Sequence, residues 1–176
     1  MKETEVKVLN VDQKKIIEII SRFDAQKIFD GEIKTTFFDF ADARISKAKN
    51  VLRLRQAGQR ALLTFKIILS KESAKKAEEY EVEVSDLQTM KKILESLGLS
   101  ETGKIQKHRT SYRLDKVKFD LDTHENELSY VPTYLEIEAE NIDLIYKYAE
   151  LLGYSVKDCL PWSTEDVINY YSTKGK

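Results

Sequence analysis

Glu3-Thr4-Glu5-Val6-Lys7-Val8 is the stretch that decides the fold, because ionisable and apolar side chains alternate along it. Side chains two residues apart on a β-strand point to the same face. Glu3, Glu5 and Lys7 therefore share one face of the predicted strand. Val6 and Val8 share the other. Taken alone, this pattern also fits the solvated side of an ordinary open sheet.

Six later segments repeat the alternation, and their polar faces often hold side chains of one sign. These faces are Arg53 with Arg55; Thr64 with Lys66; Glu79, Glu81 and Glu83; Lys107, Arg109, Ser111 and Arg113; Lys118, Asp120 and Asp122; and Glu136 with Glu138. Like charges side by side repel, so a solvated surface gains nothing from such doublets. We interpret them as facing a bound charge inside a closed sheet.

Periodicity places the expected elements along the chain. Strands are expected at about 2–9, 27–40, 50–57, 61–68, 78–84, 104–114, 116–123 and 133–140. Helices are expected at about 12–22, 86–97, 143–152 and 163–171, with N-caps at Asp12, Asp86, Asp143 and Ser163. With only two prolines, six glycines and no low-complexity linker, the chain is predicted to form a single domain over 1–176.

The short loops between these strands favour an antiparallel sheet, and eight strands are enough to close a barrel. We therefore predict an α+β fold, a closed antiparallel eight-stranded β-barrel with a charged interior and helices packed on the outside. The second helix has an apolar stripe to place against that outer face, followed by Gly98 as a stop. The stripe consists of Leu87, Met90, Ile93, Leu94 and Leu97.

The overall composition excludes several classes of function. The 29 basic and 30 acidic side chains nearly cancel, which argues against a general binder of nucleic acid. No apolar stretch approaches the roughly 20 residues that span a bilayer, so we expect a cytoplasmic protein without a membrane partner. A single cysteine, Cys159, and two histidines do not support a zinc site. Any metal should have oxygen ligands, as Mg²⁺ or Mn²⁺ prefers.

The charged lining would suit a polyphosphate and a divalent cation together. Arginine and lysine offer charge-assisted hydrogen bonds to phosphate oxygens, and carboxylates offer hard oxygen ligands to the metal. Crowding by Arg53, Arg55 and Arg109 is expected to lower the pKa of Lys66 or Lys107. Either lysine would then be able to act as a catalytic base, although phosphate contact is the default role of both.

Over almost its whole length the chain resembles the CYTH domain, or triphosphate tunnel metalloenzyme, superfamily. This superfamily includes class IV-type adenylyl cyclases, thiamine triphosphatases and inorganic triphosphatases. The resemblance rests on six motifs in family order: Glu3-x-Glu5-x-Lys7; Leu52-Arg53-Leu54-Arg55 with Leu63-Thr64-Phe65-Lys66; Glu79-Tyr80-Glu81; Lys107-His108-Arg109 with Arg113; Asp120-Leu121-Asp122; and Tyr134-Leu135-Glu136-Ile137-Glu138.

The resemblance implies a role for each group of charged residues. Metal ligands would be Glu3, Glu5, Asp122, Glu136 and Glu138. The triphosphate would be bound by Lys7, Arg53, Arg55, Lys66, Lys107, Arg109 and Arg113. Supporting ion pairs, or a second metal position, would involve Glu79, Glu81, Glu83 and Asp120.

Three functions fit this set of residues, and we favour the first. It is hydrolysis of a triphosphate such as tripolyphosphate, ATP or thiamine triphosphate by a monomer or homodimer. The second is cyclisation of ATP to cyclic AMP and pyrophosphate, and the third is a binding module without turnover. Thr35-Thr36-Phe37-Phe38-Asp39 has phenylalanine where some inorganic triphosphatases have a tyrosine. The segment with Trp162, Ser163 and Tyr170 is interpreted as a packing helix, with a lid or plug at a tunnel mouth as the alternative.

Overall fold

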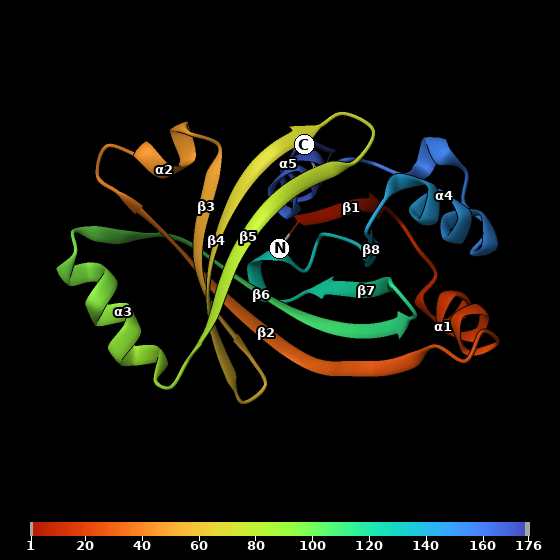
Figure 1. The fold of residues 1–176 in the computed structure, drawn as a ribbon, viewed down its shortest axis with the longest axis horizontal. Coiled ribbons are helices and arrows are strands. Elements are labelled where there is room, and N and C mark those ends of the chain that lie inside the picture. The colour runs from red at the N-terminus through yellow and green to blue at the C-terminus, as the bar shows by residue number, and fades with distance from the viewer. Residues whose placement is uncertain (1, 175–176) are drawn as a thin grey trace.

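The computed structural model describes residues 2–174, and within them eight strands close into one antiparallel barrel (Figure 1). The strands are β1 (Lys2–Val8), β2 (Gln26–Phe40), β3 (Asn50–Ala57), β4 (Arg60–Lys71), β5 (Lys75–Val84), β6 (Leu99–Leu114), β7 (Val117–His124) and β8 (Tyr134–Ala139). Their order around the barrel is β1-β5-β4-β3-β2-β6-β7-β8, and β8 pairs with β1 to close it. The predicted fold class is confirmed.

Most neighbouring strands also follow one another along the chain. Only the pairings β1 with β5, β2 with β6 and the closing pair join strands that are distant in sequence. β2 and β6 are the longest strands, with 15 and 16 residues, and they pair along most of their length. Two register shifts on β2, at Lys27/Phe29 and Phe37/Phe38, mark irregularities of the kind that bend a strand around a barrel.

The α-helices are α1 (Gln13–Ser21), α2 (Arg44–Lys47), α3 (Leu87–Ser96), α4 (Ile142–Leu151) and α5 (Thr164–Lys174). Two 3-10 helices cover Asn126–Leu128 and Val156–Asp158. Figure 1 shows α1 and α4 near β1, β7 and β8, and α3 at the opposite end of the molecule. Among residues 2–174, no helix combines the length and the apolar character needed to cross a lipid bilayer.

The apolar core lies outside the barrel, as the alternation predicted. Val6 and Ile137 point outward from β1 and β8, and both are fully buried. They form one cluster with Ile16 of α1 and Ile145 of α4. A second cluster joins Leu94 of α3 to side chains of β2, β3 and β6. Covering the outer face in this way leaves the charged face of each strand turned toward the barrel axis.

The C-terminal helix has a different position. Val167 of α5 is fully buried against Tyr134, and Leu9 and Trp162 pack on the same cluster. Tyr134 lies two residues before Glu136 on β8, so both side chains point into the barrel. α5 thus packs through apolar side chains, as expected of a packing helix, but the wall that it contacts is the inner one, as the alternative of a plug would require.

Three of the four predicted N-caps are confirmed. The side chains of Asp12, Asp86 and Ser163 accept hydrogen bonds from backbone amides at the starts of α1, α3 and α5. The prediction of Asp143 is wrong, because α4 begins at Ile142 and is capped by Asn141, whose Oδ1 accepts from the Leu144 amide at 3.0 Å. Asp143 instead lies in the first turn, where its charge complements the helix dipole.

The apolar stripe predicted for α3 is narrower than expected. Leu87, Met90 and Leu94 pack on the barrel, but Ile93 is 46% exposed and Leu97 is 65% exposed. Leu97 follows the last helical residue, and the chain then turns at Gly98 with a φ of +89°. A single helix on a curved sheet buries only the side chains nearest to the line of contact, so Ile93 and Leu97 stay in solvent.

Candidate active site

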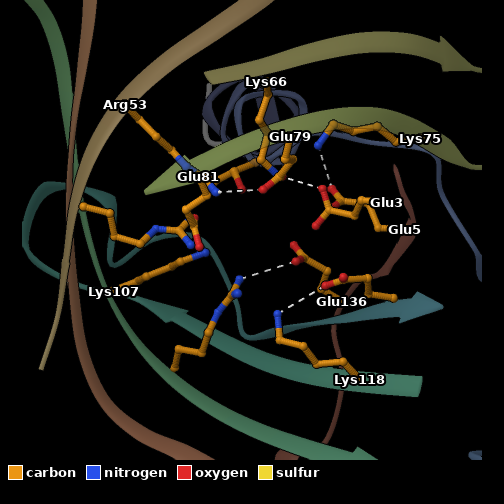
Figure 2. Close-up of a pocket in the computed structure, with 14 residues that line it drawn as sticks. Glu3, Glu5, Arg53, Lys66, Lys75, Glu79, Glu81, Lys107, Lys118 and Glu136 are labelled. Carbon is orange, nitrogen blue, oxygen red and sulfur yellow. Dashed lines mark hydrogen bonds and ion pairs between the residues drawn. The ribbon is translucent and has the colours of Figure 1, made fainter. Parts of the chain in front are cut away.

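The barrel encloses a cavity of about 210 Å³ whose lining is almost entirely ionisable (Figure 2). Every strand except β2 contributes to it, and α5 adds one threonine. The lining residues are Glu3, Glu5, Arg53, Arg55, Lys66, Lys75, Glu79, Glu81, Lys107, Arg109, Lys118, Glu136, Glu138 and Thr164. The alternation seen in seven segments of the sequence thus converges on one enclosed site.

The cavity has an acidic half and a basic half. Figure 2 shows the carboxylates of Glu3, Glu5 and Glu136 close together on the side of β1 and β8. Arg53 and Lys107 extend toward them from the opposite side, on β3 and β6. This separation of charge gives the cavity two kinds of binding surface, one for cations and one for anions.

Arg109 is held rigidly in the basic half by carboxylates behind it. Its Nε and Nη2 donate to Asp122 at 2.6 Å each, and its Nη1 contacts Asp120. Lys107 Nζ also donates to Asp122, at 2.5 Å. Burial acts to lower the pKa of Arg109, but Asp120, Asp122 and Glu136 outweigh it and raise the pKa well above its usual value.

The assignment of Asp122 as a metal ligand therefore needs correction. Its side chain is fully buried, it is absent from the cavity lining, and both of its oxygens accept hydrogen bonds from Arg109. Asp120, also buried, contacts Arg109 and lies 2.9 Å from Lys118 Nζ. Both aspartates are placed to orient cationic side chains, which is the supporting role expected for Asp120.

Arg55 is the least compensated cation of the site. Within residues 2–174 it has no ion pair or hydrogen bond, and its Nε is shielded from solvent without an acceptor. Arg53 is nearly as isolated, since its closest carboxylate oxygen, on Glu79, is 4.0 Å away. Burial, together with Arg53 and Arg109, lowers the pKa of Arg55 to about 9. A buried guanidinium without a partner is costly, and an anion bound between these two arginines would relieve that cost.

The acidic half consists of four glutamates on β1 and β8. Burial raises the pKa of Glu138, and the neighbouring charges of Glu3 and Glu136 add to the rise, although Lys118 donates to Glu138 at 3.2 Å. This mutual repulsion of carboxylates is the electrostatic condition that a divalent cation relieves. Glu5 completes the set of oxygen donors lining this half.

These four glutamates fit Mg²⁺ or Mn²⁺ by the chemistry of their donors, because both metals prefer carboxylate oxygen. In the described part of the chain, no three acidic, histidine or cysteine side chains are already gathered closely enough to hold a metal ion. Lysines hold the carboxylates instead, as in the contact of 2.8 Å between Lys75 Nζ and Glu5. Metal binding would replace such ion pairs.

Lys7 was predicted to bind the triphosphate, but the structure places it behind the cavity wall. It is 1% exposed and absent from the lining, and its Nζ lies 3.0 Å from Glu5 and 2.6 Å from Glu136. Burial acts to lower its pKa, but Glu136 and Glu5 outweigh this effect and raise the pKa well above its usual value. Lys7 thus braces two carboxylates that belong to different strands, β1 and β8.

Lys66 and Lys107 are the two lysines proposed as bases. Burial lowers the pKa of Lys66 to about 7, and Arg53 adds to the effect. Burial and Arg109 lower the pKa of Lys107 to about 8. The predicted lowering is confirmed for both, with burial as a larger cause than the arginines. Lys66 Nζ lies 2.8 Å from Glu3 and also contacts Glu79, so it stands where the two halves meet.

The remaining predicted residues divide into two groups. Glu79 and Glu81 line the cavity, and Thr64 Oγ1 donates to Glu81 at 2.9 Å. Glu83 and Arg113 share a face with lining residues but are exposed and lie outside the cavity, and Glu83 pairs with Arg60 at 3.0 Å. Both lie farther along their strands than the enclosed section, so the prediction that Arg113 binds triphosphate is not supported by its position.

Three lining residues were missed from the sequence. Lys118 was visible in the alternation but was given no role. Lys75 was overlooked because its strand was expected to begin at residue 78, whereas β5 begins at Lys75 itself. Thr164 had no signal in the sequence, since it reaches the cavity only because α5 packs against the inner wall.

Comparisons with known proteins agree with this geometry. The family model described as the CYTH domain matches residues 1–160. A protein of Methanocaldococcus jannaschii with the provisional name adenylate cyclase is 26% identical over 144 residues, which cover 82% of this chain and 80% of the relative.

Two solved structures share the fold. A protein of Vibrio parahaemolyticus, provisionally named an adenylate cyclase, has a TM-score of 0.80 and 14% identity, covering 95% of this chain and 97% of its own. A protein of Hippeastrum, provisionally named an adenylyl cyclase and described as having a dominant triphosphatase activity, has a TM-score of 0.68 and 18% identity. That match covers 96% of this chain and 95% of the other.

The position of Lys7 leads to a prediction about stability. Lys7→Met should lower the free energy of unfolding by about 3–5 kcal/mol, because it leaves Glu5 and Glu136 buried without their shared cation. Lys34→Met is the control, since the ion pair of Lys34 with Glu32 is exposed and its loss should cost less than about 1 kcal/mol. Urea unfolding at neutral pH measures both. Equal stability of the two variants would contradict the bracing role.

Proposed function

Because this chain belongs to the CYTH domain family, we propose that it is a metal-dependent enzyme that hydrolyses a triphosphate inside the barrel. The observation that supports this most directly is the guanidinium of Arg55, which has no partner within residues 2–174 and lines the same cavity as Arg53 and the four glutamates. An extended polyanion would neutralise the arginines while its metal ion neutralises the glutamates. A simple anion binder would have no use for the acidic half.

The basic half would bind and orient the phosphate chain. Arg55 has no partner within residues 2–174, Arg53 has only the distant contact with Glu79, and Arg109 is pre-oriented by the aspartates behind it. Such fixed donors stabilise negative charge without reorganising as the reaction proceeds. Lys107 adds an ammonium group beside Arg109 while it is protonated.

Glu3, Glu5, Glu136 and Glu138 would hold Mg²⁺ or Mn²⁺, which supplies Lewis-acid polarisation of phosphoryl oxygens when bound. Lys66, whose Nζ contacts Glu3 and Glu79, would accept a proton from the attacking water in its neutral form. The bond from the water oxygen to the terminal phosphorus forms as the bridging P–O bond breaks, and the shortened phosphate chain leaves with the bridging oxygen. Thr35 and Phe37 pair with Arg55 and Arg53 across β2 and β3, so no tyrosine assists Lys66 from this strand.

Cyclisation of ATP is the second candidate, because the relatives named above have provisional names as adenylate or adenylyl cyclases. It would use the same charged halves but a different nucleophile, the ribose 3′-hydroxyl, which attacks the α-phosphorus and releases pyrophosphate. The products separate the two reactions from each other and from a module that binds without turnover.

The decisive experiment is product analysis with tripolyphosphate, thiamine triphosphate and ATP, each with Mg²⁺ or Mn²⁺. Orthophosphate is expected, and it should require the metal. Cyclic AMP with pyrophosphate would replace our proposal by cyclisation, and binding without product would replace it by the binding module. Glu138→Gln should lower kcat/KM at least about tenfold by weakening metal binding. Glu83→Gln, a change at an exposed glutamate outside the cavity, should leave it unchanged.

The role of Arg55 gives a second prediction. Arg55→Gln should raise KM for the triphosphate about 10- to 100-fold, because it removes a charge-assisted hydrogen bond to phosphate. Arg113→Gln is the matched control on β6 and should leave KM unchanged, since Arg113 is exposed outside the cavity. Steady-state kinetics measures both. A larger effect of the Arg113 substitution would refute the placement of the substrate.

The pKa of Lys107, about 8, predicts the pH dependence. Below that pH the ammonium group is charged and attracts the polyanion; above it the amine is neutral and the attraction is lost. The value of kcat/KM, which reports the free enzyme, should therefore fall as pH rises through about 8. Lys107→Arg should move this fall to higher pH, whereas Lys104→Arg, at an exposed position, should not. An unchanged profile in Lys107→Arg would exclude Lys107 as its origin.

A further inference from the structure

A second cavity lies at the surface, beside α5. Its chemistry differs from that of the charged cavity inside the barrel, which is called the tunnel from here on. The volume of the second cavity is about 470 Å³, within the range of small-molecule sites. It is lined by Lys71, Pro161, Trp162, Asp166, Asn169 and Tyr170. The mechanism proposed above uses none of these residues.

Two aromatic rings form the main surface of this cavity. Trp162 and Tyr170 meet edge to face, with ring centroids 5.1 Å apart and planes at 61°. Trp162 also packs against the cluster around Val167 and Tyr134, which fixes its orientation. A pair of fixed rings with open space beside them is a surface on which a flat ring can stack.

The polar groups of the cavity are few, and two of them neutralise each other. Asp166 lies 2.6 Å from Lys71 Nζ and also accepts hydrogen bonds from the backbone amide and hydroxyl of Ser163. The exposed amide of Asn169 offers both a donor and an acceptor. The cavity therefore presents aromatic surface, a neutralised ion pair and a few neutral polar groups, which suits an uncharged heterocycle.

This cavity adjoins the charged tunnel through two separate elements. At the start of α5, Thr164 lines the tunnel, and Trp162 and Asp166 on either side of it line the aromatic cavity. On the β4–β5 hairpin, Lys71 lines the aromatic cavity and pairs directly with Lys75, which lines the tunnel. Figure 1 shows α5 behind β4 and β5, and the Lys71–Asp166 ion pair joins them.

We propose that the cavity of Trp162 and Tyr170 binds the planar heteroaromatic group of an organic triphosphate whose phosphate chain occupies the tunnel. This inference rests on the proposed function and specifies its substrate class, because inorganic tripolyphosphate has no such group. The shared chemistry is a flat heterocycle joined to the first phosphate through a sugar or a short carbon chain. A nucleotide base and the uncharged aminopyrimidine ring of thiamine are its two sources.

Trp162 is the only tryptophan in the sequence, so tryptophan fluorescence reports on the surroundings of this one ring. The test is titration of the full chain with ATP, thiamine triphosphate and tripolyphosphate while the emission of Trp162 is recorded. Quenching by ATP or by thiamine triphosphate, but not by tripolyphosphate, supports the inference and identifies the source of the ring. The same change with all three ligands, or with none, overturns it.

Substitutions give a second, independent readout by isothermal titration calorimetry. Tyr170→Ala should weaken binding of the quenching organic triphosphate about 5- to 100-fold, as expected for a lost stacking partner, and leave tripolyphosphate affinity within twofold of wild type. Tyr80→Ala, at an exposed tyrosine on β5, is the control and should change neither. Asn169→Ala, at an exposed site, tests the same cavity should Tyr170→Ala fail to fold.

The outcomes separate this inference from the proposed function. If Tyr170→Ala and Asn169→Ala weaken the binding of the organic triphosphate and of tripolyphosphate equally, or weaken neither, the aromatic cavity is not a ring site. Hydrolysis can still be observed in that case. If no triphosphate is turned over but the organic ligands alone quench Trp162, the proposed function fails and the ring site remains.

Discussion

The structure depends on one electrostatic constraint, the enclosure of many charged side chains inside a barrel. Charges removed from water are tolerated only when opposite charges lie close to them. The carboxylates of the acidic half meet this condition through lysines, as Lys7 does for Glu5 and Glu136. Arg109 meets it through two aspartates. Within residues 2–174 Arg55 has no such partner, and this imbalance is what would be expected of a binding site and not of a merely structural network.

The same constraint explains why the core lies outside the barrel. An interior filled with ion pairs contributes little net stability, because the cost of desolvation offsets most of the attraction. Stability must then come from apolar burial elsewhere, and the outward faces of β1, β7 and β8 supply it under α1 and α4. Helix caps such as Asp12 and Asn141 hold these helices at the ends where they join the barrel. The site and the core are therefore opposite faces of the same strands.

The sequence was sufficient for the fold and for much of the site, since a period of two assigns every strand residue to one face or the other. It did not determine how far along each strand the enclosed section extends. For this reason Arg113 and Glu83 were expected in the site, although both are exposed outside the cavity. It also did not determine which inward-facing side chains are long enough to reach the cavity. The short side chains of Asp120 and Asp122 remain at the wall, where they hold Arg109, while the longer glutamates reach the cavity. Contacts made by a distant element, such as Thr164 of α5, leave no local pattern.

The balance of charge in the cage links substrate binding to metal binding. Seven cationic and six carboxylate side chains line the cavity, and behind them Lys7 adds one positive charge and the aspartates Asp120 and Asp122 add two negative charges. The whole set is therefore neutral when its groups have their usual charges. A polyphosphate that entered alone would leave several negative charges uncompensated in a poorly solvated space. A polyphosphate that entered with a divalent cation would bring much of the missing positive charge, and the glutamates would then exchange lysine partners for the metal. In a neutral cage of this kind, each ligand lowers the electrostatic cost of binding the other, so their affinities are coupled.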